Sequence, residues 1–145
     1  MQTLSYCQYC NAPSDDVHHS LHKWYHDNIY GIKVVDDNEL FARLILEINQ
    51  AGLSWTTILR KWKTFYDAYD HFEIEKVALY DESTYLQLME NEGIIRNKLK
   101  IMAAIHNAQE ILKIQQSHGS FASWLQIHQK TSPHIKEWQK IFKKQ

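Results

Sequence analysis

The sequence predicts one all-α domain over residues 1–145, with an irregular segment over residues 1–30. Two observations predict this fold class. Only 4 glycines and 2 prolines occur in 145 residues, whereas a β-sandwich or β-barrel needs many turns. Beyond residue 36, apolar residues recur at the spacing of one face of an α-helix. The length also suits a single domain with a sizeable core.

The expected helices are separated by short breaks. Asp36 and Glu39 have the spacing of an N-terminal capping box, and the helix that they open ends before Gly52. Ser54 is a good cap for the next helix, which is expected to run to about residue 69. The remaining helices are expected at about 74–79, 82–91, 96–112, 120–127 and 137–144.

Composition excludes several classes of protein. The formal net charge of -1 gives no bulk signature of nucleic-acid binding, so any DNA contact must come from a local patch or from backbone groups. The N-terminus has no apolar signal region, and no apolar run approaches the length of a membrane span. We therefore expect a cytoplasmic protein without a membrane partner.

The N-terminal segment contains a candidate metal site. Its cysteines, Cys7 and Cys10, form a Cys-x-x-Cys pair, which indicates a reduced metal or redox site where no secretion signal precedes it. Together with His26 they have suitable chemistry for tetrahedral zinc. The alternative is two reduced thiols in a flexible terminus. Further candidates for a fourth zinc ligand are His18, His19 and His22.

The stretch from residue 46 to residue 55 is the strongest candidate for the chemistry. It combines the carboxylate of Glu47, a break at Gly52 and the large aromatic ring of Trp55. A carboxylate beside an aromatic wall suits a pocket for a flat, electron-poor ring. The alternative is an ion pair between Glu47 and Arg43, four residues apart on an exposed helix face.

Residues 84–112 have the pattern of a helix-hairpin-helix. A short helix, a turn at Gly93 and a helix start carrying Arg96, Lys98 and Lys100 follow one another. In such a hairpin the backbone N–H groups of a helix N-terminus face a DNA phosphate. The alternative is an ordinary corner between two helices with a solvated charged face.

Three collinear blocks resemble the DNA-3-methyladenine glycosylase I family. Two of them, Tyr25-His26-Asp27-Asn28-Ile29-Tyr30-Gly31 and Leu46-Glu47-Ile48-Asn49-Gln50-Ala51-Gly52-Leu53-Ser54-Trp55, are similar to its signature blocks. The third, Gly93-Ile94-Ile95-Arg96-Asn97-Lys98-Leu99-Lys100-Ile101, is similar to its hairpin block. The resemblance implies a helix-hairpin-helix DNA glycosylase fold. It also implies a monofunctional repair enzyme that flips 3-methyladenine out of alkylated DNA and hydrolyses its N-glycosidic bond.

The resemblance further implies roles for individual residues. Glu47 would be the catalytic residue and accept hydrogen bonds from the flipped base, on which Trp55 would stack. Tyr25 and Tyr30 would line the base pocket, Tyr30 at a position where the family usually has Trp. Leu53 is a candidate wedge for the gap that the base leaves. The other expected DNA contacts are Gly93, Arg96, Lys98 and Lys100.

Cys10 and His26 match the family's N-terminal zinc ligands, with Cys7 as a substitute, so a structural zinc with an incomplete ligand set is expected. The family continues beyond the position of Gln145, and this chain is expected to lack that C-terminal segment. We expect a monomer that binds double-stranded DNA containing alkylated bases and uses no nucleotide cofactor. The alternative is a truncated, non-catalytic helix-hairpin-helix module for DNA binding or protein interaction.

Overall fold

The computed structural model describes residues 3–131, and side chains up to residue 129. All regular secondary structure in this range is helical, which confirms the all-α prediction; the helix expected at 137–144 lies outside it. The elements are α1 (Tyr6–Asn11), α2 (His19–Asn28), α3 (Asp37–Gln50), α4 (Trp55–Arg60), α5 (Trp62–Ala68), the 3-10 helix η1 (Asp70–Phe72), α6 (Ile74–Val77), α7 (Glu82–Glu90), α8 (Lys98–His118) and α9 (Phe121–Thr131).

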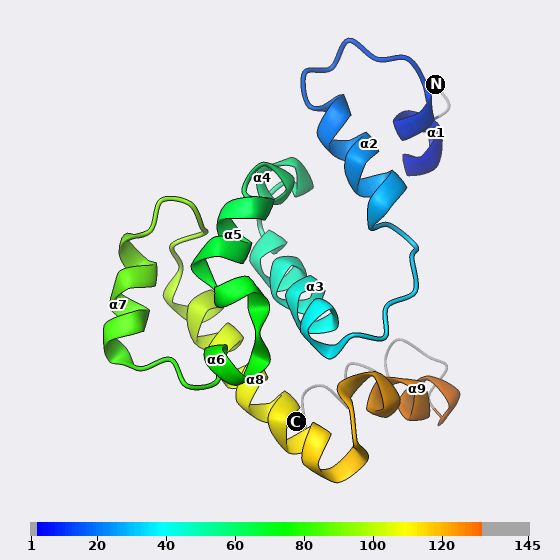
Figure 1. Ribbon diagram of the computed structural model, residues 1–145. Helices are drawn as coiled ribbons and strands as arrows, with labels where there is room; N and C mark the ends of the chain where they lie inside the picture. The colour runs from blue at the N-terminus through cyan, green and yellow to red at the C-terminus, as the bar shows by residue number, and fades with distance from the viewer. Residues whose placement is uncertain (1–2, 132–145) are drawn as a thin grey trace.

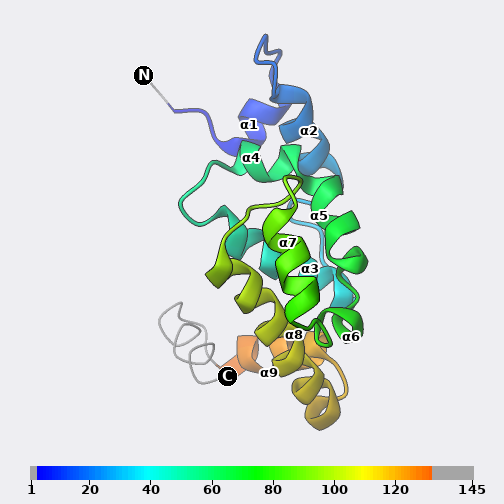
Figure 2. The same ribbon diagram turned by 90° about the vertical axis from the view of Figure 1, so that its left-hand side faces the viewer.

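Helices α3 and α8 organise the molecule. Helix α3 contacts α4, η1, α6, α8 and α9, and Figures 1 and 2 show α1, α2 and α4 gathered at one end and α9 at the opposite end. The start of α3 also holds α9, because the Asp37 carboxylate accepts hydrogen bonds from the backbone N–H groups of Phe121 and Ala122 at 2.8 and 2.9 Å. None of the described helices is long and apolar enough to cross a membrane.

The core forms where the apolar faces of the helices meet. Helix α3 buries Phe41, Ile45 and Leu46, and the same cluster includes Ile101 and Ala108 of α8. The buried residues of α8 recur at intervals of three and four, as Ile101, Ala104 and Ala108 do, which is expected for one face of a helix. The opposite face of α3, which carries the candidate carboxylate, is therefore left outside the core.

The N-terminal segment is helical, and this corrects the expectation of irregular structure over residues 1–30. Ser5 and Gln8 form a reciprocal capping box that starts α1. In α2, His22, Tyr25 and His26 share one face at i, i+3 and i+4 spacing. Aromatic and histidine side chains supply this face instead of aliphatic ones, so the apolar pattern of the helix is weak in the sequence.

The boundaries of the other helices can be compared with the capping residues and breaks in the sequence. Asp36 caps α3 by accepting a hydrogen bond from the backbone N–H of Glu39 at 2.8 Å, as predicted. The single helix expected from Ser54 to about residue 69 is two helices, because the chain departs from helical geometry at Lys61. The long helix starts two residues later than expected, behind the cap residue Asn97.

Candidate active site

An open pocket of about 480 Å³ lies where helices α1 to α4 meet. This volume falls within the range of small-molecule sites. Four of its residues, Tyr25, Tyr30, Glu47 and Trp55, are among the predicted site residues, so the structure brings the predicted base-binding group together. The pocket is lined by Tyr6, His22, Tyr25, Tyr30, Glu47, Gln50 and Trp55.

The break between α3 and α4 places Trp55 in this pocket. Gly52 has a φ of 80°, a conformation that an L side chain rarely adopts. The turn is closed by the Gln50 side chain, whose Nε2 donates to the Leu53 carbonyl at 2.7 Å. The Ser54 hydroxyl then accepts from the backbone of α4 and starts that helix. As a result, Trp55 opens α4 directly behind the end of α3.

Aromatic rings from three parts of the chain form one wall of the pocket. Tyr25 and Trp55 meet edge to face, with ring centroids 5.2 Å apart, and Tyr6 and Tyr30 do the same at 5.3 Å. The centroids of Tyr25 and Tyr30 lie 6.2 Å apart. Such pairs hold one another in place, so the wall is formed before any ligand binds.

The Glu47 carboxylate has no hydrogen-bond or ion-pair partner within residues 3–131. Arg43, its expected partner under the alternative interpretation, pairs instead with Glu39 at 3.1 Å. Burial, and then the negative charge of Glu47, raise the pKa of the Tyr25 hydroxyl. Tyr25 therefore stays protonated at neutral pH and can donate a hydrogen bond beside a carboxylate that can accept one.

Three lining residues were not predicted for the base pocket. Tyr6 and His22 belong to one network, in which the His22 Nδ1 lies 3.1 Å from the Tyr6 hydroxyl and its Nε2 lies 2.8 Å from the Thr56 hydroxyl. Burial lowers the pKa of His22 and favours the neutral ring. Gln50 could have been identified from spacing, because it follows Glu47 by three residues on one helix.

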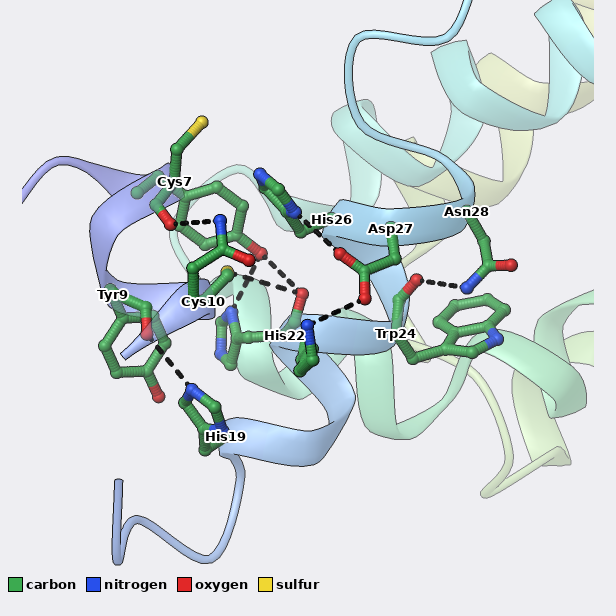
Figure 3. Close-up of polar contacts among 12 residues, drawn as sticks. Cys7, Tyr9, Cys10, His19, His22, Trp24, His26, Asp27 and Asn28 are labelled. Atoms are coloured by element: carbon green, nitrogen blue, oxygen red, sulfur yellow. Dashed lines mark hydrogen bonds and ion pairs between the residues drawn. The ribbon is translucent and has the colours of Figure 1, made fainter. Parts of the chain in front are cut away.

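The predicted zinc ligands are not gathered into a centre in the described part of the chain. The Cys10 thiol is buried and donates to the His22 carbonyl at 3.6 Å, whereas Cys7 is exposed and points away from it (Figure 3). His26 binds Asp27 through Nδ1 at 2.9 Å. Within residues 3–131, no group of three or more His, Cys, Asp or Glu side chains could hold a metal ion. These residues alone do not fit a zinc centre, and zinc stays a prediction.

Helices α7 and α8 form the expected hairpin. The backbone N–H of Gly93 donates to Asn91 Oδ1 at 2.8 Å, and the Gly93 carbonyl accepts from the Thr64 hydroxyl of α5. A Cβ atom at this glycine would lie 2.9 Å from both Asn91 Oδ1 and Thr64 Cβ. The turn therefore packs closely against α5, and Asn97 caps the helix that follows it.

The basic residues of the hairpin differ in their surroundings. Arg96 and Lys98 are exposed, and neither side chain has a hydrogen-bond partner within the described residues. Lys100 is different, because its Nζ donates to the backbone carbonyls of Asn49 and Ala51, each at 2.7 Å. Lys100 thus makes two contacts within the chain, and its expected phosphate contact stays a prediction. Leu53, the candidate wedge, is 36% exposed.

Comparison with known sequences relates this chain to one family of proteins. The family model described as methyladenine glycosylase matches residues 16–145. The chain is 38% identical over 101 residues to DNA-3-methyladenine glycosylase 1 of Escherichia coli K12, covering 70% of this chain and 54% of that protein. It is 33% identical over 101 residues to DNA-3-methyladenine glycosylase of Haemophilus influenzae, covering 70% and 55%. The chain thus spans about half the length of these curated relatives.

Solved structures agree in both fold and sequence. A structure of 3-methyladenine DNA glycosylase I from Staphylococcus aureus matches with a TM-score of 0.73 and 36% identity, covering 83% of this chain and 63% of that one. A solution structure of 3-methyladenine DNA glycosylase I matches with a TM-score of 0.65 and 38% identity, covering 72% and 56%. The chain therefore belongs to the methyladenine glycosylase family.

Proposed function

We propose that this chain carries the base-recognition and DNA-binding core of a monofunctional DNA glycosylase, which hydrolyses the N-glycosidic bond of 3-methyladenine. The observation that carries the proposal is the pocket in which the unpartnered Glu47 carboxylate lies beside a wall of aromatic rings. Curated relatives that are 38% and 33% identical to this chain over 101 residues bear the name of this activity.

The chemistry of the substrate fits this pocket. 3-Methyladenine in DNA carries a positive charge, so its bond to the sugar is weak and the base leaves readily. An enzyme for this reaction needs little general acid. It needs aromatic faces and a carboxylate that attract a cationic ring. Neutral adenine lacks the charge and would gain little from the same surroundings.

In the proposed reaction the damaged nucleotide first rotates out of the duplex into the pocket. Trp55 stacks on the base, Glu47 accepts hydrogen bonds from it, and Leu53 occupies the gap left in the duplex. The glycosidic bond then breaks with its electron pair going to the base. Water adds to the sugar carbon and loses a proton to solvent. The pocket-lining residues include no lysine, which suits hydrolysis by water and a monofunctional enzyme.

The hairpin would hold the DNA. The N-terminus of α8 presents backbone N–H groups behind the Gly93 turn, and Arg96 and Lys98 supply exposed positive charge next to it. This combination binds phosphates without requiring a basic protein overall. We infer a monomeric enzyme that acts in the cytoplasm on double-stranded DNA and uses no nucleotide cofactor.

The test is the release of free base from duplex DNA that has been methylated with a radiolabelled methyl donor, with unmethylated duplex as the control. We expect labelled 3-methyladenine in the soluble fraction. A folded chain that neither releases nor binds 3-methyladenine would overturn the proposal. Salt-dependent DNA binding without base release, and without preference for damaged sites, would instead support the non-catalytic helix-hairpin-helix module.

A further inference from the structure

We propose that Lys100 is a positioning residue, which fastens the end of α3 to the hairpin and so sets the base pocket, and that it is not a phosphate ligand. The inference rests on the proposed function for its catalytic consequence. Its structural basis is the pair of 2.7 Å hydrogen bonds from Lys100 Nζ to the carbonyls of Asn49 and Ala51. These residues are 51 and 49 positions away in the sequence.

The two carbonyls belong to the end of a helix. Asn49 lies in the last turn of α3 and Ala51 is its C-cap residue, so their oxygens lack the intrahelical donors that carbonyls have in the middle of a helix. The C-terminal end of a helix also attracts a cation. A lysine ammonium satisfies both requirements at once. These two carbonyls take up two of the three N–H donors of the Lys100 ammonium.

The contact bears on the turn that shapes the pocket. Ala51 precedes Gly52, and the Gln50 side chain closes the same turn onto the Leu53 carbonyl at 2.7 Å. Gln50 and Trp55 both line the pocket. A shift of the Ala51 carbonyl would therefore displace one pocket wall together with the candidate wedge.

The other end of the contact is equally fixed. Lys100 lies in the first turn of α8, where its backbone N–H donates to the Asn97 side chain at 3.1 Å. The next residue, Ile101, is fully buried in the core. Lys100 thus connects two elements and fixes the spacing between them. One is the start of α8, which would hold a phosphate, and the other is the turn after α3, which would enter the duplex.

Salt dependence separates a positioning lysine from a phosphate-binding one. Each phosphate contact contributes about 0.9 to the slope of log affinity against log salt. For undamaged duplex, we expect Lys98→Met to lower this slope by about 0.9 and Lys100→Met to leave it unchanged. Lys98 is the matched control, since it starts the same helix and is exposed.

The rate of base release should depend on Lys100, although the salt slope does not. With enzyme in excess over methylated DNA, we expect Lys100→Met to slow base release by up to about 100-fold, the cost of a displacement near 1 Å at a reacting centre. Lys100→Arg retains donors for both carbonyls and should restore most of the rate. Rates are compared well below the melting temperature of each variant. A fall that only tracks the unfolded fraction, or a lowered salt slope with an unchanged rate, would overturn the inference.

A spectroscopic measurement tests the contact without requiring activity. In ¹⁵N NMR spectra, the Lys100 ammonium should exchange slowly with water and the Lys98 ammonium rapidly. Lys100→Met should also move the amide signals of residues 51–54, which Lys98→Met should leave in place. Rapid exchange at Lys100 would overturn the inference. A protected Lys100 in a chain that releases no base would overturn only the proposed function.

Discussion

Arg43 donates from Nε to Glu39 Oε1 at 3.1 Å, so it pairs with the carboxylate four residues before it and not with Glu47, four residues after it. The same guanidinium also donates to the carbonyls of Ile29 and Ile32, each at 3.2 Å. With these three contacts Arg43 fixes the segment that connects α2 to α3. Glu47 is left free of this network, and its negative charge is available to a ligand in the pocket.

The first prediction concerns the charge of Glu47. Glu47→Gln keeps the shape of the side chain and removes its charge, so it should weaken the binding of free 3-methyladenine by about 10- to 100-fold, as expected for hydrogen bonds to a charged group. The affinity for undamaged duplex should change less than about twofold. Quenching of tryptophan fluorescence by the base would report the first affinity, and fluorescence anisotropy of a labelled duplex the second.

Glu39→Gln is the matched control for this experiment. It changes a carboxylate of the same helix that binds Arg43 and the Tyr66 hydroxyl, the latter at 2.9 Å. It should lower the free energy of unfolding and leave the affinity for the base near its original value. Equal losses of base and duplex affinity in Glu47→Gln would show that Glu47 is a structural residue.

A second prediction concerns the hairpin turn. Gly93→Ala would place a Cβ atom 2.9 Å from both Asn91 Oδ1 and Thr64 Cβ, closer than ordinary carbon contacts. Because the Asn91 side chain accepts a hydrogen bond from the backbone of the same turn, the backbone must move, at a cost of about 1 to 3 kcal/mol. We expect a lower free energy of unfolding in urea and weaker binding of duplex DNA.

The control for this substitution is Glu92→Ala at the neighbouring position. Glu92 accepts a hydrogen bond from Lys61 through its backbone carbonyl at 2.7 Å, and truncation of its exposed side chain leaves that bond in place. It should keep the stability of the original chain. An unchanged stability and DNA affinity in Gly93→Ala would show that the turn has room for a methyl group.

Features with local causes were predictable from the sequence. The start of α3 at Asp36, the break at Gly52 and the restart behind Ser54 each follow from a residue type and its immediate neighbours. These signals involve residues within a few positions of one another, and the structure places each as expected.

Features that depend on distant partners were not predictable. A lysine at a helix start gives the same pattern whether it faces a phosphate or, as Lys100 does, carbonyls about 50 residues earlier in the chain. Tyr6 reaches the pocket only because α1 packs against α2. The Ser5–Gln8 spacing is a local signal for the start of α1 that the expectation of irregular structure over residues 1–30 left out. Nothing nearby in the sequence indicated where that helix would lie.

A third prediction concerns a buried hydroxyl. Tyr69 is fully buried, and within the described residues its hydroxyl has no hydrogen-bond partner. Its ring stacks on Phe72 with centroids 5.4 Å apart, a contact that phenylalanine would keep. Tyr69→Phe should therefore raise the free energy of unfolding, by up to about 1 to 3 kcal/mol.

The measurement for Tyr69→Phe is the urea midpoint, with the slope of the unfolding free energy against urea unchanged. Tyr66→Phe is the comparison, since it removes a hydroxyl that does have an acceptor, Glu39. It should lower the stability. A lower stability in Tyr69→Phe as well would mean that the Tyr69 hydroxyl is hydrogen-bonded in solution.

The last prediction concerns alkaline pH. Burial raises the pKa of Tyr66, Tyr69 and Tyr80 above the ordinary value of 10.0, and hydrogen bonds to Glu39 and Asp70 add to the shift at Tyr66 and Tyr80. The contribution of these groups to stability is fully present below pH 10. Above it, the unfolded chain loses protons that the folded chain keeps, so stability falls as the pH rises towards the folded pKa values.

Urea unfolding measured between pH 9 and pH 11 would test this. For the fully buried Tyr69, the loss should approach about 1.4 kcal/mol per pH unit once the unfolded tyrosine has ionised. Tyr69→Phe should remove this part of the slope, so the variant gains most over the original chain at the highest pH. If the two chains lose stability in parallel above pH 10, then Tyr69 ionises alike in the folded and unfolded states.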